Sequence, residues 1–163
     1  MPNSKIADII SKMVDVVFDC NLCELDATDK VNAIRELTLK TPALKMLSDP
    51  DKFNENVIRR EEDMSTGLGK GVAIAHGNCS KDEKLIVALG VSHKGIEFDA
   101  IDNKPVHILF LVANPPNSQK EYLHILSTIV GMLRHESFRR SLLNSHNSAL
   151  MNNRLRNSLN LLN

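Results

Sequence analysis

The chain lacks the features that would place it in a membrane or outside the cell. No apolar run approaches the ~20 residues that a helix needs to cross a bilayer. The opening MPNSK leads into mixed polar sequence rather than the apolar core of a signal peptide. Its three cysteines, an odd number, argue against a disulfide framework in a chain of 163 residues. We therefore expect a cytoplasmic protein.

The sequence also has no excess of either charge. Its 20 basic residues balance its 20 acidic residues, so no global field would attract nucleic acid or anionic lipid. We accordingly expect no nucleic-acid partner and no insertion into a membrane. A hydrophobic content of 42% and a charged content of 25% are typical of globular proteins. A chain of 163 residues suffices for one domain with its own core.

Strand and helix patterns alternate along the chain. Alternating apolar residues predict a strand over 16–22, and continuous apolar runs over 85–91 and 106–113 are typical of strands covered on both faces. Helices, or a turn in the first case, are predicted over residues 4–14, 26–40, 52–61, 118–134, 136–144 and 147–162. Ser118 followed by Glu121 predicts a capping box at the start of the helix over 118–134. The alternation predicts one α/β domain over residues 1–163. It leaves open whether residues 152–163 are ordered.

The glycine-rich stretch STGLGKGVAIAHG, residues 65–77, matches no nucleotide-binding signature. A P-loop has Lys and then Ser or Thr after its last glycine, with a helix behind it, whereas Gly71 is followed by Val72 and a strand. A dinucleotide-binding turn likewise leads from strand to helix. The stretch therefore predicts a turn with positive φ that enters a strand, and we expect no ATP or NAD cofactor.

A zinc site could be built in principle from CNLC at residues 20–23 and His76-x-x-Cys79. The spacing argues against it. Residues three apart on a strand point to opposite faces, so Cys20 and Cys23 would not converge on one ion. Cysteine is also a common buried residue. We expect no metal.

Two of the six histidines stand at positions suited to chemistry. His76 ends a predicted strand, and His124 lies near the start of the helix over 118–134, off its core stripe. That core stripe consists of Tyr122, Leu126, Ile129 and Leu133, widened by Leu123 and Val130. Because catalytic groups gather at the carboxyl ends of strands in open α/β sheets, both imidazoles could face one shallow site. Among the others, His107 is predicted to be a hydrogen-bonded core or edge residue, and His135 and His146 to be solvated.

The charged run RREED, residues 59–63, precedes the glycine-rich stretch. One interpretation is a solvated run at the end of a helix. The other is that one arginine turns inward to meet an anion. The spacing alone favours the first.

These residues resemble the phosphorylation-site segment of the enzyme IIA domains of the bacterial phosphotransferase system, in the branch of fructose, mannitol and nitrogen-regulatory type. Arg60-Glu61 and STGLGKGVAIAHG match the pattern R-E-x-x-x-S-T-G-x-G-x-G-x-A-x-P-H-G, and residues 95–113 resemble its later strands. YLHIL, residues 122–126, resembles the helix of the family's second histidine. Ala75 stands in place of the usual proline, whose fixed φ is lost.

The resemblance implies a mixed sheet with helices on both faces and a phosphotransferase without metal or cofactor. It implies that His76 accepts a phosphoryl group, that His124 orients it and that Arg60 stabilises its charge. A neutral imidazole can attack phosphorus directly, and an arginine fork can hold the equatorial oxygens. We expect the amides of the glycine-rich stretch to add donors.

The resemblance also implies the partners. The donor would be the carrier HPr or a nitrogen-branch paralogue, and the acceptor an enzyme IIB or a regulatory target. Three functions stay open at this point: a relay for sugar uptake, a regulator of the nitrogen type, or a binding domain that no longer transfers phosphoryl groups. Neither the sugar, the target nor the oligomeric state follows from the sequence.

Overall fold

A five-stranded mixed sheet is the centre of the fold in the computed structural model, which describes residues 16–144 and 148–160. In spatial order its strands are β1 (Val16–Glu24), β4 (Leu85–Ile96), β5 (Val106–Asn114), β3 (Val72–Asn78) and β2 (Gly67–Gly69). β1 runs parallel to β4 and β3 parallel to β5, whereas the β4–β5 and β2–β3 pairs are antiparallel. The predicted mixed sheet is thus confirmed. The helix or turn predicted over residues 4–14 lies outside the described residues.

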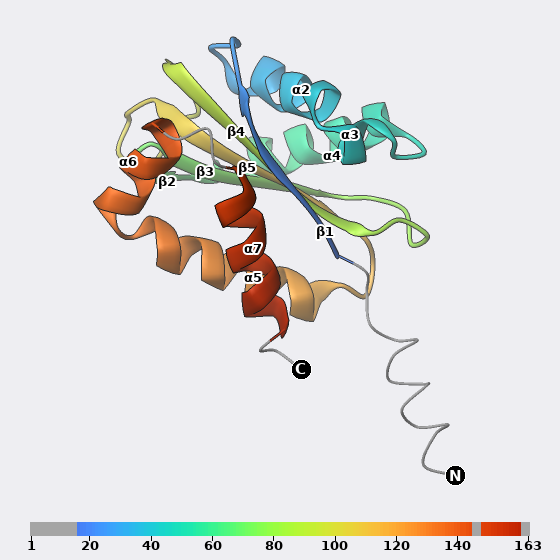
Figure 1. Cartoon of the computed structure of the whole chain (residues 1–163). Coiled ribbons are helices and arrows are strands. Elements are labelled where there is room, and N and C mark those ends of the chain that lie inside the picture. The colour runs from blue at the N-terminus through green and yellow to red at the C-terminus, as the bar shows by residue number, and fades with distance from the viewer. Residues whose placement is uncertain (1–15, 145–147, 161–163) are drawn as a thin grey trace.

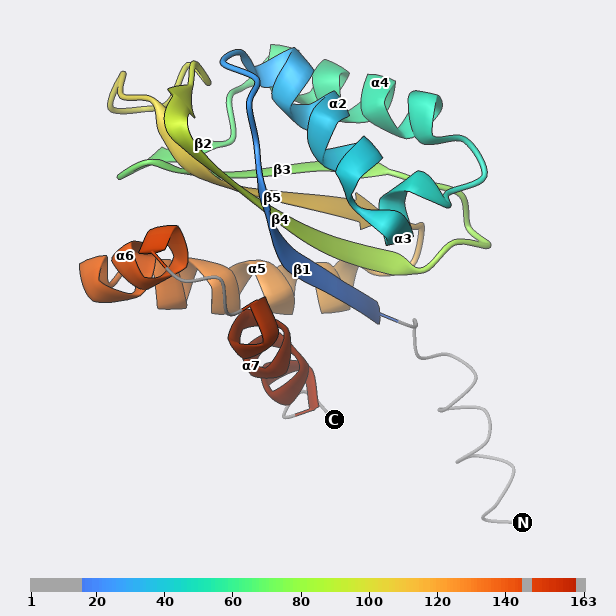
Figure 2. The same cartoon turned by 45° about the horizontal axis from the view of Figure 1, so that its top comes forward.

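Helices cover both faces of this sheet, as predicted (Figures 1 and 2). One layer consists of α2 (Lys30–Lys40), α3 (Pro42–Lys45) and α4 (Pro50–Asp63), and the other of α5 (Gln119–Leu133), α6 (Glu136–Asn144) and α7 (Ser148–Asn160). Within the described part of the chain, no helix is long and apolar enough to span a bilayer.

The sheet separates two cores, and the alternation of side chains decides which residues enter each. On β3, Ala73 and Ala75 pack in the core under α2 and α4, whereas Val72 and Ile74 pack in the core against α5. By the same alternation His76 points to the α5 face. Both cores exclude water from the continuous apolar runs of β4 and β5, which confirms the prediction that these strands are covered on both faces.

The cysteines of β1 follow this alternation too. Cys20 is fully buried in the core against α5, and Cys23 packs against the core of the opposite face. The prediction that they point to opposite faces is confirmed. Burial also raises the pKa of Cys23 to about 11, so this thiol is protonated at neutral pH and is a poor metal ligand.

The start of α5 differs from the capping box predicted for Ser118 and Glu121. The Ser118 side chain makes no cap hydrogen bond to the helix. Its hydroxyl instead donates to the side-chain oxygen of Asn114 and to the Pro115 carbonyl oxygen at 2.6 Å. The capping-box prediction was wrong because the turn after β5 competes for the hydroxyl. As a result, the first turn of α5 is tied to the carboxyl end of β5.

The buried face of α5 is also narrower than predicted. Leu123 and Val130, expected to widen the core stripe, are 52% and 39% exposed. Ile125 is buried instead, together with Tyr122, Ile129 and Leu133. The sheet contacts one side of this helix, so only residues near that side of the 3.6-residue repeat are covered.

α7 packs against β1, the strand at the margin of the sheet, and binds one of its main-chain N–H groups. Asn152 Oδ1 accepts a hydrogen bond of 2.9 Å from the main-chain N–H of Cys20. The α7 side chains Met151 and Leu155 are buried between the helix and the sheet. The predicted C-terminal helix is therefore present as α7.

His93 joins β4 to the end of β1 and to α6. Its Nδ1 lies 2.8 Å from both carboxylate oxygens of Glu24, and its Nε2 lies 3.1 Å from the carbonyl oxygen of Leu143. A carboxylate and a carbonyl can only accept, so only the imidazolium satisfies both contacts at once. These two hydrogen bonds raise the pKa of His93.

The His93 contacts predict a pH-dependent stability. The folded-state pKa lies above the ordinary value, so this contribution is complete below about pH 6.5 and is lost as pH rises through the raised pKa. We expect the free energy of unfolding of the wild type to fall relative to that of His93→Ala as pH rises above that value. Denaturant titrations of both proteins at several pH values measure this difference. Parallel pH profiles of the two proteins would contradict the prediction.

Candidate functional site

His76 stands near the end of β3, where one edge of that strand is open. The last hydrogen bond from the β2 side runs from the Ile74 N–H to the Thr66 carbonyl oxygen at 3.2 Å. On the other side, pairing with β5 continues as far as Asn78. Ala75 is fully buried and pairs with Leu111. The sheet therefore restrains the backbone before His76, a restraint that proline would otherwise supply.

A surface hollow of about 290 Å³ lies at this open edge. His76 and Arg60 both line it and both are half-buried, so the structure brings these two predicted residues together. Arg60 is held in place by a 2.9 Å hydrogen bond that its Nη1 donates to the Met64 carbonyl oxygen. The remaining lining residues are Asn56, Arg59, Asp63, Gly77 and Asn78. Two guanidinium groups and one imidazole thus surround a space open to solvent.

The residue of α5 that touches His76 is Tyr122. The tyrosine hydroxyl oxygen lies 3.1 Å from His76 Nδ1, and the two ring centroids are 5.1 Å apart. His124 was the predicted neighbour. Two helical positions correspond to a turn of roughly 200°, so His124 points to a different side of α5 from Tyr122. The structure places the tyrosine where the sequence interpretation placed the second histidine.

The electrostatic surroundings keep the His76 imidazole neutral. Burial lowers its pKa first, and the positive charge of Arg60 lowers it further. Burial raises the pKa of Tyr122, against an opposing effect of Arg60. At neutral pH the site therefore holds an uncharged imidazole, an uncharged phenol and a nearby cation. A neutral imidazole with a free lone pair is a nucleophile.

Glu61, next to Arg60, has a structural role that the sequence interpretation missed. Its carboxylate is 4% exposed and accepts hydrogen bonds from the N–H of Thr66, at 3.0 Å, and from the Thr66 hydroxyl. Lys30 Nζ lies 3.6 Å away. Interpreting the whole run as solvated was wrong for Glu61. The glutamate instead fixes the connection between α4 and β2, and with it the end of the helix that carries Arg60.

Residues 69–71 of the glycine-rich stretch form the predicted turn with positive φ, in the hairpin of β2 and β3, but this hairpin lies far from His76. Gly69, Lys70 and Gly71 have φ of 87°, 57° and 78°, and the Lys70 N–H donates to Asp102 Oδ2 at 3.0 Å. The hairpin lies at the amino end of β3, five residues before His76, a span of roughly 16 Å at strand geometry. Its amides are too distant to contact a group on His76. That part of the prediction was wrong.

Gly77 permits α4 to approach β3 directly beside His76. A Cβ at this position would lie 2.6 Å from Val57 Cγ2 and 2.8 Å from Val57 N. Val57 precedes Arg60 by less than one helical turn. The close contact therefore sets the distance between α4 and β3, and with it the position of Arg60 relative to His76.

Replacing Gly77 with alanine is expected to lower the free energy of unfolding by about 1–3 kcal/mol, because the added methyl group collides with helix backbone. Denaturant titration measures the change. Gly131→Ala is the matched control: a Cβ there meets nothing within 4 Å, and the helix interior should gain about 0.5–1 kcal/mol. Equal stability of the Gly77→Ala protein and the wild type would contradict the expected collision.

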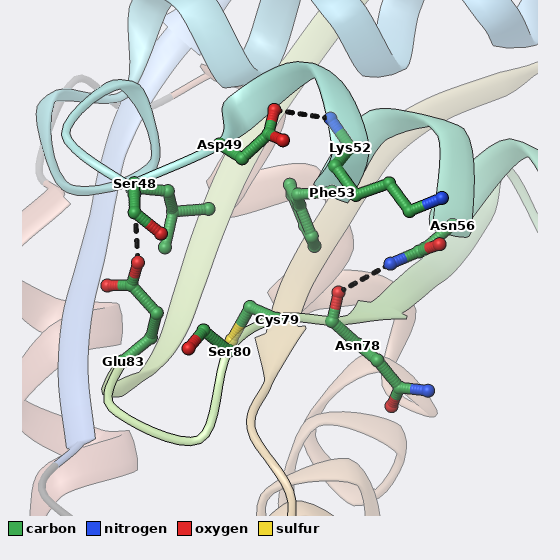
Figure 3. A pocket seen from close by; sticks show the side chains of 10 residues that line it. Ser48, Asp49, Lys52, Phe53, Asn56, Asn78, Cys79, Ser80 and Glu83 are labelled. Carbon is green, nitrogen blue, oxygen red and sulfur yellow. Dashed lines mark hydrogen bonds between the residues drawn. The ribbon is translucent and has the colours of Figure 1, made fainter.

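A second hollow of about 230 Å³ adjoins the first (Figure 3). Asn56 and Asn78 line both. Leu47 and Phe53, which are 6% and 2% exposed, contribute its apolar surface. The Cys79 thiol in its wall is protonated, since burial and the charge of Glu83 raise its pKa to about 12. The polar side chains Asp49 and Glu83 already accept hydrogen bonds from main-chain N–H groups at 3.0 and 2.8 Å.

The remaining histidines lie elsewhere. His107, on the inner strand β5, is half-buried with Nδ1 2.7 Å from the Ser92 carbonyl oxygen, which confirms a hydrogen-bonded structural residue. His135 is exposed, as predicted. His146 lies outside the described residues. Across residues 16–144 and 148–160, no group of three or more His, Cys, Asp or Glu side chains is arranged to hold a metal ion.

Comparison with known proteins agrees with this fold. Residues 17–158 match the family described as phosphoenolpyruvate-dependent sugar phosphotransferase system, EIIA 2. The crystal structure of nitrogen regulatory protein IIA-Ntr from Neisseria meningitidis is 30% identical, with a TM-score of 0.71 over 82% of this chain and 91% of that one. The chain belongs to this enzyme IIA family of phosphotransferase components.

One further relative and one solved complex also match this chain. The fructose-specific EIIABC component of Bacillus subtilis is 29% identical over 119 residues, which are 73% of this chain but only 19% of that protein. The Escherichia coli complex of enzyme IIAMTL with phosphorylated enzyme IIBMTL matches with a TM-score of 0.66 at 20% identity, over 83% of this chain and 97% of the matched one. At that identity the likeness concerns the fold.

Proposed function

We propose that this chain is a phosphocarrier that takes a phosphoryl group on His76 from phosphorylated HPr or a nitrogen-branch paralogue. It then passes the group to an enzyme IIB, or its phosphorylation state regulates a target protein. The observation that carries the proposal is the placement of the His76 imidazole beside Arg60 in a hollow open to solvent, where burial and the charge of Arg60 lower the pKa of the imidazole. Membership of the enzyme IIA family supports the same chemistry.

The reaction needs one bond to form and one to break. The lone pair of a His76 nitrogen attacks the phosphorus of a phosphohistidine on the donor, and the donor nitrogen leaves with its electron pair. Charge in the transition state is spread over three equatorial oxygens. Arg60 supplies a fork of N–H donors for these oxygens, and the second guanidinium, Arg59, adds positive charge to the hollow. The return step to the acceptor runs through the same geometry in reverse.

The shape of the site favours a protein as the partner. The His76 hollow lies at the surface, and the adjoining hollow offers the apolar surface of Leu47 and Phe53 (Figure 3). An apolar side chain of a partner could anchor there while its phosphoryl group meets His76. The related complex with phosphorylated enzyme IIBMTL supports an enzyme IIB as one such partner.

Replacing His76 with alanine is expected to abolish labelling by phosphorylated HPr and its paralogue, because none of the other described residues that line the hollow is a histidine. Incorporation of ³²P and phosphorus NMR measure the phosphohistidine. His135→Ala, at an exposed position remote from the hollow, is the control and should be labelled like the wild type. Undiminished labelling of the alanine variant at position 76 would refute the assignment. A wild type that no donor labels would instead favour the binding-domain function.

The regulatory form of the proposal is favoured by the likeness to IIA-Ntr, which covers most of both chains. The test of this form measures how fast the phosphorylated protein loses its phosphoryl group to an enzyme IIB. Rapid loss of the label to an enzyme IIB indicates the sugar relay. A label that persists with every enzyme IIB, together with binding to a target that differs between the two phosphorylation states, indicates regulation.

A further inference from the structure

We propose that Tyr122 is the positioning residue of the site: it accepts the Nδ1–H of His76 and so leaves the lone pair on Nε2. This inference rests on the proposed function, because it names the nitrogen that reacts. The 3.1 Å contact between the tyrosine oxygen and Nδ1 is its starting point. His76 lines the surface hollow and Tyr122 does not, so Nε2 is the nitrogen left to face incoming phosphorus.

The charge of Arg60 favours the proton on Nδ1. Arg60 lines the same hollow as His76 and acts on its ring, and a lone pair faces a cation more favourably than an N–H does. With the hollow-side nitrogen unprotonated, a neutral ring carries its proton on Nδ1, and the Tyr122 hydroxyl, which can donate or accept, then accepts it.

Tyr122 can hold this position because its surroundings are rigid. Its side chain is 7% exposed and packs in the core against the sheet. It lies in the first turn of α5, which Ser118 ties to the end of β5 through Asn114 and Pro115. The ring plane is tilted by 47° to that of His76, so the two rings pack together as well as sharing the hydrogen bond.

A tyrosine differs from a histidine in one respect that matters here. Burial raises the pKa of Tyr122, so it stays neutral and adds no charge to the site. It orients the nucleophile without adding positive charge for the phosphoryl oxygens. In this chain the charge must come from Arg60 and Arg59, the cations of the hollow.

Tyr122→Phe tests the inference, since it removes the hydroxyl and keeps the ring. With ¹⁵N-labelled histidine, we expect Nδ1 to carry the proton in the unphosphorylated wild type and both tautomers to be populated in the variant. We also expect the rate of phosphorylation to fall about 5–10-fold, as for one lost hydrogen bond, with KM for phosphorylated HPr unchanged. Phosphoramidate, which loses ammonia as it phosphorylates histidine, should show the same loss because it needs no docking.

Further variants separate this role from a structural one. Tyr122→His restores a ring nitrogen that can accept, and should recover part of the Nδ1–H signal and of the rate. Leu123→Ala, at an exposed neighbouring position, should change neither. An unchanged tautomer in Tyr122→Phe, or a change in His124→Gln instead, would overturn the inference. Because the ¹⁵N measurement needs no phosphorylation, it decides the role of Tyr122 even if no donor labels His76.

Discussion

Replacing Arg60 with glutamine is expected to slow phosphoryl transfer to His76 by about 10²–10³-fold, as for other lost donors to a transition-state oxyanion. Arg60 is the cation whose charge acts on both His76 and Tyr122, and a neutral amide cannot replace it. Lysine at position 60 keeps the charge but loses the fork of donors, so Arg60→Lys should be impaired less. Single-turnover labelling with phosphorylated HPr measures all three rates.

The same variant has a readout that needs no donor. Removing the positive charge should raise the pKa of His76 toward its ordinary value, which NMR titration measures directly. Below the pKa the imidazole is protonated and cannot attack, so the labelling rate of the wild type should fall only in acid. That fall should move to higher pH in Arg60→Gln. Arg59→Gln, the exposed neighbour in the hollow, should lose less than tenfold, by analogy with weak surface charges. Equal losses at both positions would contradict the specific role of Arg60.

Replacing Glu61 with alanine is expected to lower the free energy of unfolding by about 3 kcal/mol, because charge-assisted hydrogen bonds are lost at a buried site. The N–H and hydroxyl of Thr66 would lose their acceptor. Lys30 would keep Asp99, 3.3 Å away and largely exposed, and its contact with the Phe98 ring. The connection between α4 and β2 should loosen, and Arg60 with it. Denaturant titration and labelling of His76 measure the two effects.

Two further variants serve as comparisons for Glu61→Ala. Glu61→Gln keeps one acceptor oxygen and should lose about half as much stability, since one hydrogen bond can survive. Glu62→Ala changes an exposed neighbour and should stay within about 0.5 kcal/mol of the wild type. If Glu61→Ala were as stable as Glu62→Ala, the buried carboxylate would not be the element that fixes this connection.

Much of the fold could be predicted from local sequence patterns. Continuous apolar runs identified β4 and β5, and the alternation in β1 correctly placed Cys20 and Cys23 on opposite faces. These features depend on the periodicity of apolar side chains, which can be recognised in a short segment of the sequence. The capping box at Ser118 failed for the opposite reason. Its hydroxyl has a competing partner in the preceding turn, and a pattern of spacings does not reveal which partner wins.

The site was predicted in part. The juxtaposition of His76 and Arg60 followed from a resemblance to a known segment, and both line one hollow. Tyr122 was assigned to the core stripe, where it does lie, but its hydroxyl reaches past the core to His76. Tyr122 is the single tyrosine of the chain, and it was predicted on a buried helix face beside the end of a strand. That placement could have indicated that its hydroxyl contacts a polar group of the site. Buried tyrosine hydroxyls usually have a partner.

The packing of α7 against β1 has a consequence for how the molecule meets others. An unpaired strand edge is a template on which a second chain can add a strand. The side chain of Asn152 occupies one of the main-chain donors of that template. This margin of the sheet is thereby made a poorer template for a strand of a second chain. The opposite side of the sheet is open beside His76, where the surface hollow lies.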